Sequence, residues 1–154
     1  MTETAKALKY LDYFSLLTVG KSKVPNFTWT PQQIEKLSQD EFVRRYTYKG
    51  GTFKKNNQEI PATENIGLIT GYDFLEVIDI DLKVFSTAKE KIDFWNEYLG
   101  FLKDNILDFE DKFVIYKTKN EGYHILYKSK RIQSNLKLAK LKGHKQQILE
   151  TRGN

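Results

Sequence analysis

The segment Val77–Leu82 constrains the fold more than any other part of the chain. Its sequence, VIDIDL, alternates aliphatic residues with two aspartates, Asp79 and Asp81. Residues two apart in a strand share a face, so a strand here places both carboxylates on one face and Ile78, Ile80 and Leu82 on the other. Two carboxylates beside an apolar surface repel each other and are costly to desolvate unless a cation neutralises them. Mg²⁺ and Mn²⁺ prefer oxygen ligands, so the pair is a candidate divalent-metal site. Two acids at a solvated strand end, without a metal, are the default interpretation of a D-x-D pattern that stands alone.

Two helices are expected before this strand. Apolar residues recur with helical spacing over residues 3–17, which predicts the first helix. The second is expected to begin at Thr30, an N-cap followed by proline in a capping-box pattern, and to end at Arg44 or Arg45. Gly50 and Gly51 are followed by the polar run KKNNQE at residues 54–59, so we expect an exposed turn or loop there.

The middle of the chain has the composition of strands. Residues 66–70 and 74–81 are β-rich and separated by a glycine turn, so a hairpin is expected. A long helix capped by Ser86 or Thr87 should follow. Its expected apolar face consists of Ile92, Trp95, Tyr98, Leu99 and Leu102.

Three further strands are expected in the last third of the chain. They cover residues 112–117, 123–128 and 147–152. The order is therefore two helices, two strands, one helix and three strands. This order predicts an α+β fold with a largely antiparallel sheet.

Length and composition limit the function classes. The 154 residues fit a single domain, residues 1–154, and the absence of cysteine excludes disulfides and thiol nucleophiles. No apolar run approaches the roughly 18 residues of a membrane span, and the start lacks the layout of a secretory signal. We therefore expect a cytoplasmic protein without a membrane partner. The net charge of +5, with lysines concentrated after residue 112 and acids in the middle, suits a polyanionic partner.

Two later strands carry further candidate site residues. His124 follows the Gly122 turn and shares a strand face with Leu126, so it is either a packed histidine or a ligand for a phosphate or nucleotide. Glu150 and Arg152 share a face of the last expected strand. They form either a surface ion pair or a third carboxylate beside a phosphate-binding arginine.

Together, the D-x-D, G-x-H and E-x-R strands occur in an order that resembles the catalytic core of the archaeo-eukaryotic primase superfamily. The resemblance is to the bifunctional primase-polymerase (prim-pol) domains of plasmids, phages and other mobile elements. Lys23–Pro25 with Trp29 is similar to the family's Lys-x-Pro…Trp signature, and Asn65–Gly71 to its Asn-Ile-Gly-x-x-Thr-Gly segment. The chain departs from the family at Glu121, where a glycine is common, and at its end, where the family continues through a Gly-rich strand. We therefore expect an N-terminal fragment of a longer protein.

The resemblance implies a prim-pol core with an RRM-like, largely antiparallel sheet flanked by helices. It implies two-metal nucleotidyl transfer, with two Mg²⁺ or Mn²⁺ ions held by Asp79, Asp81 and Glu150. The implied partners are a single-stranded DNA template, nucleoside triphosphates and a helicase domain further along the same polypeptide. The residues expected to bind the nucleotide are His124, Arg152, Lys119 and Asn120. Those expected to bind the template backbone are Lys128, Lys130, Arg131, Lys142 and Lys145.

Two other functions are compatible with the sequence. Acids on strands followed by an E-x-R pair also suit a metal-dependent nuclease, which leaves His124 and the early Lys-x-Pro segment without a role. A nucleic-acid-binding module with weak catalysis is favoured by Glu121 and by the early end of the family pattern. An initiator endonuclease that depends on paired histidines is poorly supported, because His124 and His144 are not paired in the sequence.

Overall fold

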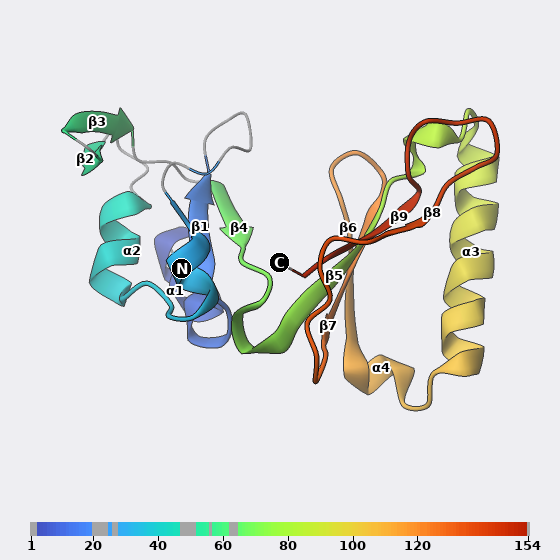
Figure 1. The fold of residues 1–154 in the computed structure, drawn as a ribbon, viewed down its shortest axis with the longest axis horizontal. Helices are drawn as coiled ribbons and strands as arrows, with labels where there is room; N and C mark the ends of the chain where they lie inside the picture. Colours follow the sequence, from blue (N-terminus) through green and yellow to red (C-terminus); the bar gives the residue numbers. More distant parts are fainter. Residues whose placement is uncertain are drawn as a thin grey trace. The chain divides into compact units, whose positions relative to one another are not determined.

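The computed structural model describes residues 3–19, 25, 28–46, 52–55, 57–61 and 65–153. It divides the chain into two compact units, Met1–Asp73 and Phe74–Asn154 (Figure 1). The described residues contain four α-helices and antiparallel sheets. The expectation of a mixed α+β chain with antiparallel pairing is therefore confirmed. Among these residues, no helix is both long and apolar enough to cross a bilayer.

The first unit combines helices with two small sheets. Strand β1 pairs antiparallel with β4, and β2 pairs antiparallel with β3. The elements are α1 (Glu3–Tyr13), β1 (Leu16–Val19), the 3-10 helix η1 (Thr30–Gln33), α2 (Gln39–Arg45), β2 (Thr52–Lys55), β3 (Gln58–Pro61) and β4 (Asn65–Leu68). Its core contains Ala7, Leu11, Leu16, Leu17, Leu37, Phe42, Tyr46 and Ile69.

Two expected helices of this unit differ from the sequence prediction. The first ends at Tyr13 rather than at residue 17, because the buried residues Leu16 and Leu17 form a strand with β4. The second is not continuous from Thr30. Ser38 adopts an extended conformation, and its side chain accepts the backbone N–H of Glu41, so a new helix begins after it.

The expected loop over residues 50–59 is also wrong in part. Strands β2 and β3 form a hairpin there, with Asn57 at φ 62° in the turn. Asparagine tolerates this left-handed conformation better than most residues, which allows the polar segment to reverse direction. Gly50 and Gly51, and Lys23 and Val24 of the Lys-x-Pro segment, lie outside the described residues.

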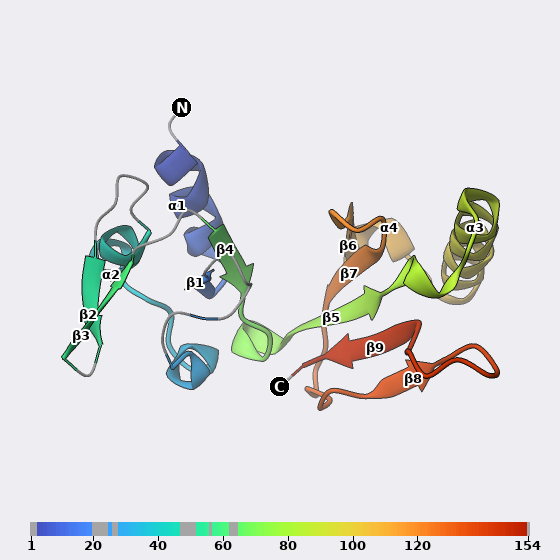
Figure 2. The same ribbon diagram turned by 90° about the horizontal axis from the view of Figure 1, so that it is seen from above.

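The second unit contains a five-stranded antiparallel sheet in the order β6-β7-β5-β9-β8. Strand β5 is central and lies between β7 and β9 (Figure 2). The strands are β5 (Leu75–Ile80), β6 (Phe113–Lys117), β7 (Tyr123–Lys128), β8 (Lys137–Ala139) and β9 (Leu149–Arg152). The helices of this unit are the 3-10 helix η3 (Leu82–Val84), α3 (Ala88–Asn105) and α4 (Phe109–Lys112). A further 3-10 helix, η2 (Tyr72–Phe74), precedes β5 and spans the sequence boundary between the two units.

The expected hairpin between residues 66–70 and 74–81 is wrong, although both segments contain strands. Strand β4 pairs with β1, whereas both edges of β5 are hydrogen-bonded to β7 and β9. The β6–β7 pair and the last strand are confirmed. Strand β8, within the basic segment, was not expected.

Helix α3 packs against one face of the five-stranded sheet and begins as predicted. Thr87 and Glu90 form a capping box at its start. The indole of Trp95 stacks on the ring of Tyr123 with centroids 3.6 Å apart, and Leu102 is buried in the same core. Ile92, however, is 57% exposed, so its assignment to the packed face is wrong. Ile78 and Ile80 of β5 occupy this packed face, so Asp79, which lies between them in the sequence, is on the opposite one.

Candidate functional site

Three strands bring predicted site residues together on that opposite face. Asp79 on β5 is paired in register with His124 on β7 and with Glu150 on β9. His124 is in turn paired with Tyr116 on β6. Cross-strand partners have neighbouring side chains on one face of the sheet. A row of four polar side chains, Tyr116, His124, Asp79 and Glu150, therefore crosses four adjacent strands.

His124 contacts both of its neighbours in this row. Its Nε2 lies 3.4 Å from Asp79 Oδ1, and its Nδ1 lies 2.5 Å from the Tyr116 hydroxyl. A carboxylate only accepts hydrogen bonds, so whenever the imidazole is neutral its proton is on Nε2 and its Nδ1 accepts the Tyr116 O–H. Burial and the negative charge of Asp79 raise the pKa of Tyr116, which keeps its hydroxyl protonated. Tyr116 thus fixes the ring orientation and tautomer of His124.

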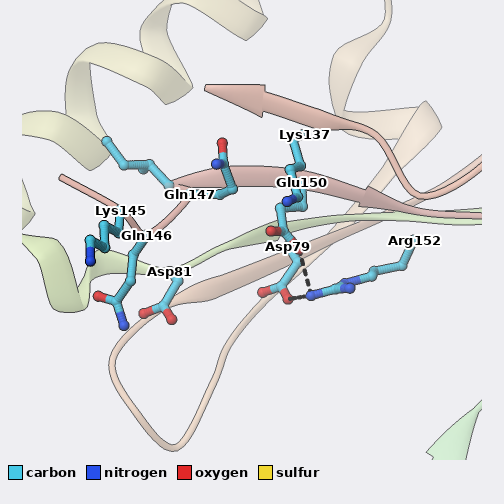
Figure 3. A pocket seen from close by; sticks show the side chains of 9 residues that line it. Asp79, Asp81, Lys137, Lys145, Gln146, Gln147, Glu150 and Arg152 are labelled. Carbon is cyan, nitrogen blue, oxygen red and sulfur yellow. Dashed lines mark hydrogen bonds and ion pairs between the residues drawn. The ribbon is translucent and has the colours of Figure 1, made fainter. Parts of the chain in front are cut away.

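Arg152 connects the two central carboxylates. Its Nη2 lies 2.7 Å from Glu150 Oε2 and 3.3 Å from Asp79 Oδ2 (Figure 3). The hydrogen bond from His124 holds the pKa of Asp79 below its usual range, and the charges of His124 and Arg152 add to this effect while burial opposes it. Asp79 is therefore ionised at neutral pH, with cationic or donor groups on two sides.

Asp81 has a different environment. It follows β5 and caps η3, where its carboxylate accepts the backbone N–H of Lys83 at 3.1 Å. The ammonium of the same lysine is also 3.1 Å from the carboxylate. Asp81 therefore contacts Lys83 locally. Among the described residues it forms no hydrogen bond or ion pair with Asp79 or Glu150.

The carboxylates nevertheless share one cavity, with a volume of about 270 Å³. Asp79, Asp81 and Glu150 line it together with lysines from β8 and from the segment before β9 (Figure 3). Its remaining lining residues are Lys137, Lys145, Gln146, Gln147, Ile148 and Arg152. Anionic and cationic groups thus line the same space, which is large enough for part of a phosphorylated ligand.

The three carboxylates suit a hard divalent cation chemically, because they supply only oxygen ligands. Within the described part of the chain, however, no group of three or more His, Cys, Asp or Glu side chains is placed to hold a metal ion. In the structure the carboxylates are paired with cationic side chains: Arg152 contacts Asp79 and Glu150, and Lys83 contacts Asp81. Metal binding therefore requires the side chains of Arg152 and Lys83 to turn away.

The other predicted residues are distributed more widely. Lys145 lines the cavity, so its place is beside the carboxylates. Lys128 on β7 is paired with Leu75 on β5. This pair lies four residues along the strands from the pair of Asp79 and His124, a separation of roughly 13 Å between the backbones. Lys119, Asn120, Lys130, Arg131 and Lys142 are exposed and do not line this cavity.

The structure adds residues that sequence reasoning missed. Tyr116 and Lys137 enter the site through strand register, since they are paired with His124 and Glu150 respectively. The sequence could have indicated Tyr116, because in the expected strand over residues 112–117 the side chains of Val114 and Tyr116 lie on the same face. Lys137 had no such signal, because β8 is short and lies in a basic segment.

The turn between β6 and β7 sets the position of His124. A Cβ on Gly122 would lie 2.2 Å from the backbone oxygen of Ile80, so only glycine allows this close approach to β5. Glu121 has φ 64°, a left-handed conformation that glycine adopts without strain. Its carboxylate is 2.8 Å from the ammonium of Lys91 on α3. The turn is thus fixed both to the central strand and to the helix.

Comparisons with known proteins do not identify this site. No protein-family model matches the chain, and no curated protein matches it in sequence.

Proposed function

We propose that the chain is the catalytic domain of a DNA primase-polymerase of the prim-pol type, acting in the cytoplasm. The observation that carries the proposal is the register of Asp79 with His124 on one side and Glu150 on the other. The D-x-D, G-x-H and E-x-R segments, which resemble the family's motifs, are thereby neighbours on one face. An RRM-like sheet and a helicase domain further along the polypeptide are parts of the same proposal.

Asp79, Asp81 and Glu150 are the residues that would hold two Mg²⁺ or Mn²⁺ ions. When bound, such ions lower the pKa of an attacking 3′-hydroxyl and neutralise charge on the departing pyrophosphate. The mixed lining of the cavity suits this assignment, because the carboxylates can face the ions while Lys137 and Lys145 face phosphate oxygens.

Arg152 and His124 have defined tasks in this mechanism. In the described state Arg152 neutralises Asp79 and Glu150, and its release leaves a bidentate donor beside the cavity for a phosphate group. His124 does not line the cavity, and its Nε2 faces Asp79, which does. Its part in nucleotide binding is to turn from Asp79 and donate the Nε2 proton to a triphosphate oxygen, while Tyr116 holds the other ring nitrogen. The incoming nucleotide is thus bound by this chain's own cations, and the template by exposed lysines that contact its backbone.

Primer extension tests the proposal. The protein is incubated with a single-stranded template, a primer, Mn²⁺ and labelled nucleotides, in parallel with the Asp79→Ala/Asp81→Ala variant. Template-dependent products that disappear in this variant support the proposal. An Asp104→Ala variant, which changes an exposed acid on α3, serves as the matched control and should retain activity. Cleavage of the DNA without added nucleotides would instead identify a nuclease.

One observation favours the alternative of a binding module with weak catalysis. All three carboxylates are already engaged by Arg152 or Lys83. If these ion pairs persist in the presence of Mn²⁺, the three carboxylates stabilise the sheet and do not bind a catalytic metal ion. DNA binding without incorporation, together with a melting temperature that Mn²⁺ does not change, would establish this alternative.

A further inference from the structure

A second cavity lies on helix α1 in the first unit and has no part in the site described above. Its volume is about 330 Å³, and its lining residues are Lys6, Lys9, Tyr10, Tyr13 and Phe14. Their spacing of i, i+3, i+4, i+7 and i+8 places Lys6, Lys9, Tyr10 and Tyr13 on one side of α1. Phe14 directly follows the helix and continues this side, because its N–H donates to the backbone oxygen of Tyr10. We refer to these five residues as the α1 patch.

Core packing does not account for the two tyrosines of the α1 patch. Tyr10 is 54% exposed and Tyr13 is 73% exposed. Helix α1 is already anchored through another face, where Ala7 and Leu11 are buried. Its last turn is also held by Lys36, whose ammonium donates to the backbone oxygens of Leu11 and Asp12. The aromatic rings are therefore displayed on an element that is fixed without them.

The side chains of the α1 patch match the aromatic bases and the phosphates of a nucleic acid. The α1 patch contains two lysines, two exposed phenol rings and no carboxylate. Aromatic faces stack on nucleobases of any sequence, and ammonium groups pair with phosphates. Tyr10 and Tyr13 are about 4.5 Å apart along the helix axis, which is close to the roughly 3.4 Å spacing of successive bases in a strand. An acidic protein surface would match the lysines but leave the rings without stacking partners.

We propose that the α1 patch binds single-stranded nucleic acid, with Tyr10 and Tyr13 stacking on bases and Lys6 and Lys9 contacting phosphates. This site lies in the first unit, Met1–Asp73, whereas the carboxylate cavity lies in the second. The proposal does not require nucleotidyl transfer, so it stands or fails separately from the function proposed above. Binding is expected to be tolerant of sequence and sensitive to salt.

Fluorescence anisotropy with a labelled oligothymidine tests the site. The Tyr10→Ala/Tyr13→Ala variant is expected to bind at least about 25-fold more weakly, since each of the two lost stacks corresponds to about fivefold or more. Tyr10→Phe/Tyr13→Phe should bind within about twofold of the unsubstituted protein, because a phenyl ring also stacks. In Lys6→Gln/Lys9→Gln, the slope of log K against log salt should fall by about 1.4, for two phosphate contacts on a single strand.

Two controls make the result specific to the α1 patch. Phe101→Ala/Lys103→Gln changes an exposed aromatic and a lysine on α3 and should leave the affinity unchanged. Asp79→Asn should also leave it unchanged, even if that variant has lost all catalytic activity. Circular dichroism confirms that each variant is folded.

A crosslinking measurement avoids substitutions altogether. With an oligonucleotide that contains 5-iodouracil, photocrosslinks are expected at Tyr10 or Tyr13 of the unsubstituted protein. The proposal is overturned if the crosslinks fall elsewhere, if folded variants of the α1 patch retain full affinity and salt slope, or if the α3 control loses affinity equally.

Discussion

Asp79 and Glu150 are directly opposed partners on β5 and β9, so two carboxylates lie side by side on one face of the sheet. Like charges at such positions destabilise a strand pair. Arg152 offsets the repulsion by contacting both carboxylates, and His124 contacts Asp79 from the other side. This arrangement keeps an anionic site folded while leaving its charges available to a stronger cation.

Arg152→Gln is expected to leave the repulsion between the carboxylates of Asp79 and Glu150 without its neutralising guanidinium. The variant should lose about 1 kcal/mol or less of the free energy of unfolding at low salt, because the guanidinium is half exposed and its pairs are screened. Mn²⁺ should raise its melting temperature more than that of the unsubstituted protein, because the competing cation is gone. Thermal unfolding with and without Mn²⁺ measures both effects. An equal Mn²⁺ response in the two proteins would contradict the assignment of the carboxylates as metal ligands.

The low pKa of Asp79 predicts a pH dependence of stability. His124 and Arg152 hold the pKa of Asp79 below its usual value of 3.8 in the folded protein. A carboxyl group with a lowered folded-state pKa contributes stability above its unfolded-state pKa and loses that contribution as the pH falls through the folded-state value. Between about pH 6 and pH 2, the unsubstituted protein should therefore lose more free energy of unfolding than Asp79→Asn. Urea unfolding at several pH values measures the difference, and parallel curves for the two proteins would contradict the prediction.

Tyr116→Phe should impair the site without unfolding the sheet. Removing the hydroxyl leaves His124 Nδ1 without its donor, so the imidazole can take the other tautomer and turn. One hydrogen bond of this kind is worth about 1 kcal/mol, which corresponds to a roughly fivefold decrease in kcat/KM for nucleotide incorporation.

Tyr98→Phe provides the matched control for this prediction. Tyr98 lies on α3, and burial raises the pKa of its hydroxyl as it does that of Tyr116. Its substitution should leave incorporation unchanged. Equal activity of Tyr116→Phe and the unsubstituted protein would show that His124 does not depend on Tyr116 for its orientation.

The sequence predicted the second unit better than the first. The alternation in the segment Val77–Leu82 correctly placed Asp79 on the face opposite the aliphatic core, because this pattern depends only on the local geometry of a strand. The start of α3 was also predictable, since a capping box is a local signal. Pairing was not predictable, because the register that joins Asp79 to His124 depends on contacts between segments more than 40 residues apart in the sequence.

The errors in the first unit have a common cause. Leu16 and Leu17 continue the apolar periodicity of α1, and a short apolar run is compatible with either a helix or a buried strand. Pairing with β4 decides between them, and that partner lies about 50 residues further along the chain. The basic residues show the same limit, because charge density in the sequence did not distinguish Lys145, which lines the cavity, from Lys128, which lies away from it.

Alanine substitutions at two glycines should have opposite effects on stability. At Gly122 an added methyl group would lie 2.2 Å from the Ile80 carbonyl oxygen, so the β6–β7 turn must move away from β5. Overpacking of this kind costs about 1–3 kcal/mol, and Gly122→Ala should also lose activity because His124 moves with the turn. At Gly100, within α3, no atom lies within 4 Å of the added methyl group, so Gly100→Ala should gain about 0.5–1 kcal/mol. Urea unfolding of both variants measures the two changes, and a stable, active Gly122→Ala would show that the close contact with Ile80 does not position the site.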